Sequence, residues 1–461
     1  MTMKKVIIIL LIATIACAGF ITARRLFNEA GEILSGTRFN WYESKTQSEI
    51  ENGNKFAQER LSKKYHVFIN GIFVDIGYDW DGIIYVPIRT ISDSLNWIVN
   101  WVPDLGMIQL VKNSHEAYVD IVNFFGKGYI PLDRLENLLS LDSVRIHGGN
   151  IEIQSGGSTH QSIDLRQLPR FSFYINGMKM TDNAVGYQEE KLVPSRIFAL
   201  SFGRVFRYDA IEGHTYIDDS RIDAMFIDGR AYSTLDQLKE VVDTGGAVFQ
   251  FRGFTPDTQP LMPVIEKGPE ENVVALTFDD YLGDKVYPLL DVLDVYNVKA
   301  TFFVIGNSIE QNAGVLEELV KRGHQAANHT WDHYNNHTLT DDEIRAQLIS
   351  TRLFTEKYGG QSAPFFRPPG GYYNDNAVRI AQNAGLQTVL WSLNSTDADP
   401  DNDAKHIKRV VTQWVHPGAI ATMHTGRDTT IKALPGIIEN LRDRGYRFVT
   451  ISEMVKLRGG E

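Results

Sequence analysis

The sequence predicts a multidomain chain whose C-terminal part is an α/β domain built on a parallel sheet, closed or nearly closed. Residues 272–278 and 300–305 are predominantly apolar runs, typical of strands that are buried on both faces of a sheet. Helix-like segments separate these and later strand-like runs up to the C-terminus. Because 461 residues exceed one ordinary hydrophobic core, we expect two or three folded units in all.

The composition is that of a globular protein, with 43% hydrophobic and 22% charged residues. Lys and Arg number 46 against 57 Asp and Glu, a net charge of -11, which excludes nucleic acid as an expected partner but leaves a glycan compatible. The single cysteine, Cys17, excludes an internal disulfide or thiolate metal cluster, so His, Asp or Glu must hold any metal. Cys17 is expected to be either a buried membrane-helix residue or a lipid-attachment site.

The N-terminus has the pattern of an export signal. Lys4 and Lys5 precede an apolar run over residues 6–23, which as a helix would span roughly 27 Å, close to the thickness of a bilayer core. We therefore expect residues 1–25 to form an uncleaved signal anchor, a transmembrane helix, with cleavage and secretion as the alternative. The polar segment 26–64 is expected to be a stalk or spacer.

A short pattern recurs along the middle of the chain: a strand, a proline-containing segment and an amphipathic helix. Its clearest copies are Gly82–Arg89, Gly128–Arg134 and Lys191–Arg196, with a weaker one from Gly229. The recurrence predicts two α+β repeat domains, residues 65–155 and 165–252. Four prolines then interrupt regular structure, so we place a linker at 253–272 and a last domain at 273–461.

The two repeat domains resemble the stalk-like domain called copper amine oxidase N-terminal. The resemblance rests on Val67–Gly71 with Tyr85–Arg89, and on Phe173–Gly177 with Val193–Arg196. It implies a wall-associated spacer or binding module. Despite the name, it does not imply oxidase activity or bound copper.

Several chemically reactive side chains follow the predicted strands of the last domain. Asp279 and Asp280 end the first strand, where side chains of a parallel barrel form the site, although two aspartates there could also cap the next helix. His329 and His333 are four residues apart and would share one face of a helix. Two imidazoles and one carboxylate make a three-ligand metal site with a position open for water.

Two further strand ends carry candidate catalytic groups. Arg367, in a proline-stiffened turn, can orient a catalytic carboxylate. His424 ends the last clear strand and is a candidate general acid.

With these motifs in order, residues 273–455 resemble the polysaccharide deacetylases with a NodB homology domain, carbohydrate esterase family 4. The resemblance implies a distorted (β/α)7-type barrel with a divalent metal, zinc first and cobalt, nickel or manganese as alternatives. It implies that Asp279 is the general base and that Asp280, His329 and His333 are the metal ligands.

The same resemblance implies roles around this core. Arg367 would hold Asp279, Asp397 would tune the acid His424, and the backbone N–H of Gly370 would help to bind the oxyanion. The sequence departs from the family pattern at four positions: Tyr281, Asn394, Ala398 and Thr422. Ala398 and Thr422 predict a roomier and more polar pocket. The expected substrate contacts are Gly370, Tyr281, Trp391 and Thr422.

The activity that the resemblance implies is hydrolysis of N-acetyl groups on a cell-wall polysaccharide, with N-acetylglucosamine or N-acetylmuramic acid of peptidoglycan as the first candidates. We expect a monomeric enzyme that is tethered to the membrane with its catalytic domain on the wall side. Chitin, an exopolysaccharide and O-acetyl xylan are alternative substrates. A different class of function also fits: a wall-glycan binding or scaffold protein with weak or no turnover.

Overall fold

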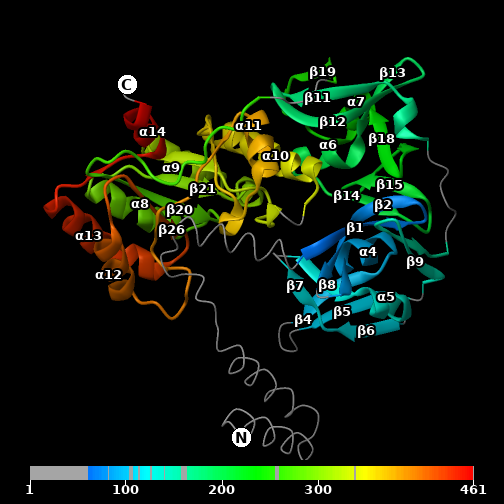
Figure 1. Ribbon diagram of the computed structural model, residues 1–461, viewed down its shortest axis with the longest axis horizontal. Coiled ribbons are helices and arrows are strands. Elements are labelled where there is room, and N and C mark those ends of the chain that lie inside the picture. The colour runs from blue at the N-terminus through cyan, green and yellow to red at the C-terminus, as the bar shows by residue number, and fades with distance from the viewer. Residues whose placement is uncertain are drawn as a thin grey trace, which may run out of the picture. The chain divides into compact units, whose positions relative to one another are not determined.

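The computed structural model describes residues 61–80, 82–102, 107–112, 115–124, 127–139, 141–156, 163–254, 259–336 and 339–459 (Figure 1). All of them belong to one compact unit, residues 44–461. The expected signal anchor and almost all of the expected stalk lie outside the described residues. Within those ranges, no helix has both the length and the apolar character that crossing a membrane requires.

The first α+β unit is a mixed seven-stranded sheet in the order β7-β8-β3-β2-β1-β10-β9, with a separate three-stranded sheet β4-β5-β6. Its elements are β1 (Leu61–Ile69), β2 (Ile72–Trp80), β3 (Ile83–Pro87), α4 (Ile88–Ser94), β4 (Ile98–Val102), β5 (Met107–Lys112), β6 (His115–Val119), β7 (Val122–Phe124), β8 (Lys127–Pro131), α5 (Leu132–Leu139), β9 (Ser143–His147) and β10 (Asn150–Gln154).

The second α+β unit has a six-stranded sheet in the order β17-β18-β13-β12-β11-β19 and a three-stranded sheet β14-β15-β16. Its elements are η1 (Leu165–Gln167), β11 (Arg170–Ile175), β12 (Met178–Tyr187), β13 (Glu190–Pro194), α6 (Ser195–Ser201), β14 (Phe206–Asp209), β15 (His214–Ile217), β16 (Ser220–Ile222), β17 (Met225–Ile227), β18 (Arg230–Thr234), α7 (Leu235–Val241) and β19 (Phe249–Gly253).

The two α+β units share one topology up to their last strands. In each, three strands lead into a short helix, a three-stranded sheet follows, and a hairpin of two strands and a second helix return the chain to the first sheet. The closing strands differ, because β10 runs parallel to β1 whereas β19 runs antiparallel to β11. Pro87, Pro131 and Pro194 each end a strand immediately before a helix. Proline fits there because its fixed φ and missing N–H are tolerated where the ladder stops and the first helical turn begins.

The C-terminal unit is built on a parallel sheet in the order β24-β23-β22-β21-β20-β26-β25, with β27 also pairing with β20. Its strands are β20 (Val273–Asp280), β21 (Thr301–Val304), β22 (Gln325–Asn328), β23 (Phe365–Phe366), β24 (Gln387–Thr388), β25 (Leu393–Asn394), β26 (Ala419–His424) and β27 (Arg447–Phe448). Its helices are α8 (Val286–Val295), η2 (Gly306–Ser308), η3 (Glu310–Asn312), α9 (Ala313–Lys321), α10 (Asp341–Gly359), η5 (Pro369–Gly371), α11 (Asp375–Asn383), α12 (Ala404–Trp414), α13 (Asp428–Asp443) and α14 (Ile451–Gly459).

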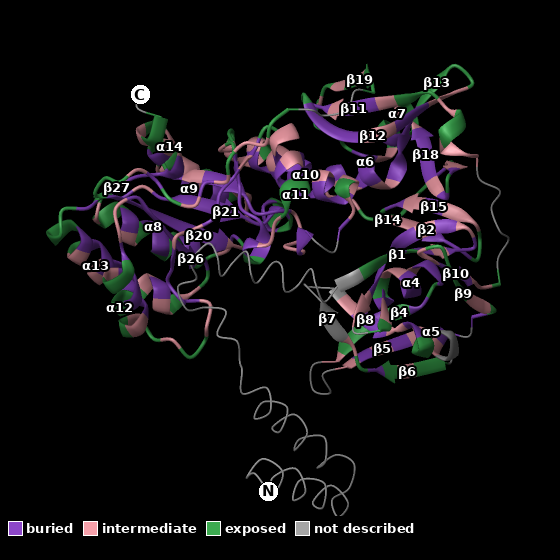
Figure 2. Ribbon diagram, in the orientation of Figure 1, coloured by how far each residue is buried: buried purple, intermediate pink, exposed green. Residues whose placement is uncertain are grey.

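The central strand of this sheet, β20, is buried on both faces, as its purple ribbon in Figure 2 shows. Val274, Leu276 and Phe278 pack into the core beneath the covering helices. Val273 and Ala275 point to the other face, into a core shared with Phe303 and Ile420. This alternation of side chains sends Asp279 to the inner face of the curled sheet. The predicted mixed α/β fold with a parallel sheet is confirmed, while closure into a complete barrel remains a prediction.

Helix α10 contributes to the cores of two units. Its Ala346 and Ile349 pack among buried side chains of the second α+β unit. At its N-terminal end, Arg196 Nη2 lies 2.8 Å from Glu343 Oε1, and Asp342 Oδ2 accepts hydrogen bonds from Thr181 and Asn183. The second α+β unit is therefore packed directly against a helix of the C-terminal unit.

Candidate metal and catalytic site

The end of β20 turns two consecutive aspartates in different directions. Asp279 is 3% exposed and lies opposite His424 in the parallel ladder between β20 and β26. Asp280 has a φ of 92°, in the left-handed region that non-glycine residues rarely adopt. Such a conformation persists where surrounding structure holds it, and here the Asp280 carbonyl accepts from Ile305 N at 3.3 Å. The turn leaves Asp279 on the inner face of the sheet and brings Asp280 close to His329 and His333, the two predicted histidine ligands.

The two predicted histidine ligands lie on a loop, so the condition that they share a helix is not met. Residues 329–335 have no helical structure, and Thr330 and His333 have φ values of 66° and 61°. Two left-handed residues bend the loop tightly enough to place the imidazole rings 5.0 Å apart, centroid to centroid. The spacing of four residues therefore brings the ligands together through a compact loop.

Asp280, His329 and His333 each offer a ligand atom, and these three atoms lie within 4.8 Å of one another. Asp280 Oδ1 is 3.5 Å from His333 Nε2 and 3.9 Å from His329 Nε2. Ligands held tetrahedrally about 2.0–2.1 Å from one zinc ion would be about 3.3 Å apart, close to these separations. The donor set therefore fits a divalent ion such as zinc.

Neighbouring groups prepare the imidazoles for metal binding. His329 Nδ1 donates to the Arg367 carbonyl at 2.8 Å, so its Nε2 carries the lone pair that faces the cluster. Burial lowers the pKa of His333. Both effects favour the form of the ring that a metal ligand requires.

Arg367 is fully buried and holds the predicted base. Its Nη1 donates to Asp279 Oδ1 at 2.6 Å and to Thr277 Oγ1 at 2.8 Å, and Nη2 donates to the Leu390 carbonyl at 2.9 Å. Its guanidinium lies 4.0 Å from the centre of the Phe303 ring. Burial lowers the pKa of Arg367, while the charge and hydrogen bond of Asp279 oppose that shift. The carboxylate of Asp279 is thus fixed in one orientation.

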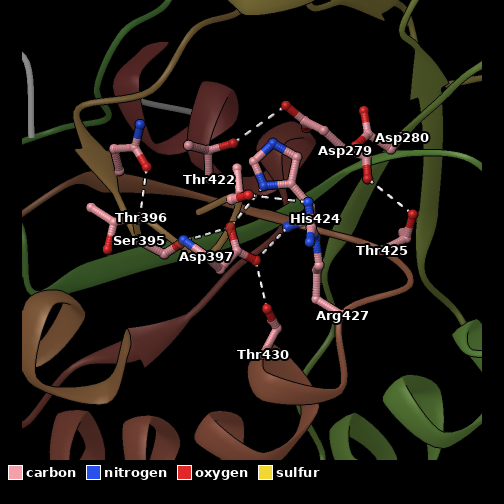
Figure 3. Close-up of polar contacts among 12 residues, drawn as sticks. Asp279, Asp280, Ser395, Thr396, Asp397, Thr422, His424, Thr425, Arg427 and Thr430 are labelled. Atoms are coloured by element: carbon pink, nitrogen blue, oxygen red, sulfur yellow. Dashed lines mark hydrogen bonds and ion pairs between the residues drawn. The ribbon is translucent and has the colours of Figure 1, made fainter. Parts of the chain in front are cut away.

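His424 and Asp397 form a second coupled pair (Figure 3). His424 Nδ1 donates to Asp397 Oδ1 at 2.7 Å, and Thr430 Oγ1 donates to Asp397 Oδ2 at 2.6 Å. Burial by itself would lower the pKa of His424, but the charge of Asp397 and its hydrogen bond outweigh burial and raise that pKa to about 9. His424 is therefore protonated at neutral pH, as a general acid must be.

The residues predicted to contact the substrate differ in burial and in their contacts. Thr422 is buried, and its Oγ1 donates to Asp279 Oδ2 at 3.3 Å, as the dashed line in Figure 3 shows. Trp391 packs against Arg367, with 5.7 Å between the guanidinium and the ring centre. Tyr281 is 53% exposed beside Asp280. Gly370 has a φ of 63° in the turn η5 that follows Arg367.

Two positions that depart from the family pattern accept hydrogen bonds here, Asn394 through its side chain and Ala398 through its backbone. The Asn394 side chain accepts a hydrogen bond from the backbone N–H of Thr396 at 2.8 Å. The Ala398 carbonyl accepts from Arg427 Nη2 at 3.1 Å.

Sequence reasoning missed four supporting side chains. Thr277 contacts Arg367, and Thr430 contacts Asp397. Gln347 contacts the ligand loop, and Thr425 contacts the end of β20. Thr277 had a detectable signal, because it lies two residues before Asp279 in a strand and so shares its face. Gln347 Oε1 accepts from the backbone N–H groups of Trp331 and Asp332, both at 2.8 Å. Its position in the middle of a helix gave no such signal.

Comparison with known proteins places the C-terminal part of the chain in a family. The family model for polysaccharide deacetylase matches residues 266–389. A peptidoglycan-N-acetylglucosamine deacetylase of Bacillus cereus is 36% identical over 193 residues, covering 41% of this chain and 90% of that protein.

Two further relatives match over a smaller share of their own length. A peptidoglycan-N-acetylglucosamine deacetylase of Listeria monocytogenes is 34% identical over 194 residues, 42% of this chain and 41% of that protein. A bifunctional xylanase/deacetylase of Pseudobutyrivibrio xylanivorans is 34% identical over 192 residues, 41% of this chain and 31% of that protein. This chain thus spans less than half the length of either protein. These matches confirm the resemblance of the C-terminal part: the chain belongs to the polysaccharide deacetylase family and is a hydrolase that acts on N-acetyl amide bonds.

Proposed function

We propose that the protein is a metal-dependent deacetylase of a cell-wall polysaccharide, with peptidoglycan N-acetylglucosamine or N-acetylmuramic acid as its substrate. One observation carries the proposal: Asp279, held by Arg367, and His424, held by Asp397, face each other at neighbouring strand ends beside the Asp-His-His cluster. The names of the Bacillus and Listeria relatives support peptidoglycan as the polymer.

The residues of the site divide the reaction between them. The chemistry that a divalent ion supplies at such a site is Lewis-acid polarisation of the acetamide carbonyl and acidification of the attacking water. Asp279 takes a proton from the water molecule as the water oxygen adds to the carbonyl carbon. Arg367 holds the Asp279 carboxylate in its orientation. His424 then gives its proton to the departing nitrogen as the C–N bond breaks. The products are acetate and a free amino sugar.

Replacement of the base tests this proposal. Asp279→Asn should lower the rate of acetate release from purified wall glycan by about 10²–10⁴-fold, the usual contribution of a positioned general base. Because the cluster of Asp280, His329 and His333 stays intact, zinc binding measured by titration calorimetry should be retained. A chelator should abolish acetate release from the unmodified protein, and added zinc should restore it. An Asp279→Asn variant as fast as the unmodified protein would exclude Asp279 as the base.

A second candidate function is a wall-glycan binding protein with weak turnover. Thr422 motivates it, because a hydroxyl bonded to Asp279 replaces an apolar side chain in the expected acetyl pocket. This candidate would be favoured if the Asp279→Asn and His424→Ala variants sedimented with wall glycan as much as the unmodified protein does, and if no acetylated polymer released acetate. The Pseudobutyrivibrio relative keeps O-acetyl xylan among the substrates to be compared, with chitin and exopolysaccharide.

We also propose the arrangement of the whole chain. Residues 1–25 would anchor the protein in the membrane as a single-pass helix, and 26–64 would lift the folded units toward the wall, with secretion after cleavage as the alternative. The α+β units would act as wall-associated modules of the copper amine oxidase N-terminal type. The strand order that the two units share before their last strands supports the internal repeat in this proposal. Fractionation of cells that express the chain with and without residues 1–25 tests the anchor, and sedimentation equilibrium tests the proposed monomer.

A further inference from the structure

A groove with a cavity volume of about 800 Å³ lies where both α+β units meet the C-terminal unit. This volume is within the range of about 300–1,000 Å³ that is usual for ligand sites. The groove is lined by side chains from all three units, among them Arg89, Trp97, Arg204, Arg207, Trp331 and Asp332.

One wall of the groove belongs to the loop that carries two metal-ligand candidates. Trp331 and Asp332 lie between His329 and His333 in the chain, and both line the groove. The second α+β unit approaches this loop closely, since a Cβ on Gly203 would lie 2.3 Å from the Trp331 ring. The groove and the metal-ligand cluster therefore share a single loop.

The charges along the groove favour an anionic ligand. Arg89 is exposed and makes no hydrogen bond or ion pair with any residue in the described ranges. Arg204 and Arg207 have long contacts with carboxylates, 3.7 Å to Asp218 and 3.4 Å to Asp209. Each guanidinium has five N–H groups, so most of their donors remain available.

Three acidic side chains line the groove, and two of them accept hydrogen bonds from neighbouring side chains. Asp75 accepts from Thr90 Oγ1 at 2.7 Å, and Asp332 accepts from Gln347 Nε2 at 2.8 Å. The third, Asp93, is partly buried and lies near Arg89 and Arg207, whose charges oppose the rise that burial causes in its pKa. Four arginines line the groove against these three aspartates, and guanidinium groups match carboxylates particularly well.

We propose that this groove is a subsite for a carboxylate-bearing stretch of the glycan chain, next to the sugar whose acetamide is cleaved. The inference rests on the proposed function, because it needs the glycan to reach the metal-ligand cluster. It makes the two α+β units part of the substrate site, and it distinguishes a carboxylate-substituted wall glycan from neutral chitin.

The test compares two substrates with the full chain. Arg89→Ala with Arg204→Ala should raise KM for wall glycan that carries its peptide carboxylates by about tenfold, the effect of roughly one charged hydrogen bond. Its kcat on that glycan should stay unchanged, as should KM for neutral chitotetraose. Arg221→Ala is the matched control, since Arg221 is a half-exposed arginine of the second α+β unit that does not line the groove. When Arg89→Lys replaces Arg89→Ala in the double variant, part of the affinity for wall glycan should return, because lysine keeps the charge.

Sedimentation with insoluble wall glycan gives a reading that does not need turnover. The double variant should bind less glycan than the unmodified protein and the Arg221→Ala control. Unchanged KM and unchanged sedimentation, or equal losses on chitotetraose and wall glycan, would overturn the subsite. If the unmodified protein released no acetate from either substrate, the proposed function would fail, and the sedimentation result would still decide whether the groove binds glycan.

Discussion

The pair of His424 and Asp397 offers a quantitative prediction about pH. The pKa of His424 is about 9 against an ordinary value of 6.5, and the difference corresponds to about 3 kcal/mol in favour of the charged imidazole. Asp397→Asn removes the largest charge that offsets burial and leaves only the smaller effects of Asp280 and Asp279, so the pKa of His424 should fall to about its ordinary value of 6.5. At pH 7.5 the protonated fraction of His424 would then fall from nearly all to roughly one-tenth. We expect the rate at that pH to fall at least tenfold.

The assay is acetate release from chitotetraose or wall glycan between pH 5 and pH 10. In the unmodified protein, kcat/KM should decline as pH rises through about 9, where His424 loses its proton. In Asp397→Asn the same decline should begin near pH 6.5 or below. Thr430→Val is the control, because it removes one hydrogen bond from Asp397 but leaves the charge. An alkaline limb at the same pH in the unmodified protein and Asp397→Asn would refute the role given to Asp397.

The same pair makes a prediction for stability, with a definite sign. The folded-state pKa of His424 lies above its unfolded value, so its contribution is fully present below about pH 6.5. That contribution is lost as pH rises from 6.5 to about 9. The difference in unfolding free energy between the unmodified protein and Asp397→Asn should therefore shrink over this interval.

Three further predictions concern the pocket, the metal and the domain contact. Thr422→Leu should raise kcat/KM on chitotetraose by about tenfold, because an apolar contact with the acetyl methyl is worth about 1–3 kcal/mol, whereas Thr422→Val should change it less. Zinc at a hundred times its Kd should stabilise the unmodified protein by about 2.7 kcal/mol in thermal unfolding, and a similar shift in Asp280→Ala would exclude Asp280 as a ligand. Gly203→Ala should lower Tm and weaken zinc binding measured by titration, because its Cβ would lie 2.3 Å from Trp331. Gly245→Ala is its control, with a positive φ but open space around it, and equal effects of the two would count against the contact.

Much of the C-terminal fold could be predicted from hydrophobic pattern. The apolar run of β20 and the aspartates at its end follow directly from the sequence, because buried parallel strands are continuously apolar and sites gather at strand ends. The pairing of Asp279 with His424 could not be worked out in this way. It depends on β26 lying beside β20, across a long stretch of chain, and only the resemblance to a family supplied it.

The ligand loop shows where periodicity fails. A spacing of four between His329 and His333 suits a helix, but Thr330 and His333 have left-handed φ values, in a loop whose backbone N–H groups donate to Gln347. Sequence spacing encodes neither feature. Burial of α10 on two faces could have been anticipated, since a helix with apolar residues on several faces is generally buried on more than one side. The sequence did not reveal that the second α+β unit covers one of these faces.

The sharing of α10 between two cores limits how this protein can be divided. Ala346 and Ile349 point into the second α+β unit, and separating the units would expose them to water together with the paired charge of Glu343. A fragment that starts at the first residue of β20 would therefore carry an open apolar strip on the helix that also supports the metal-ligand loop. Fragments for crystallisation or screening should retain residues 163–254, so that this strip stays covered.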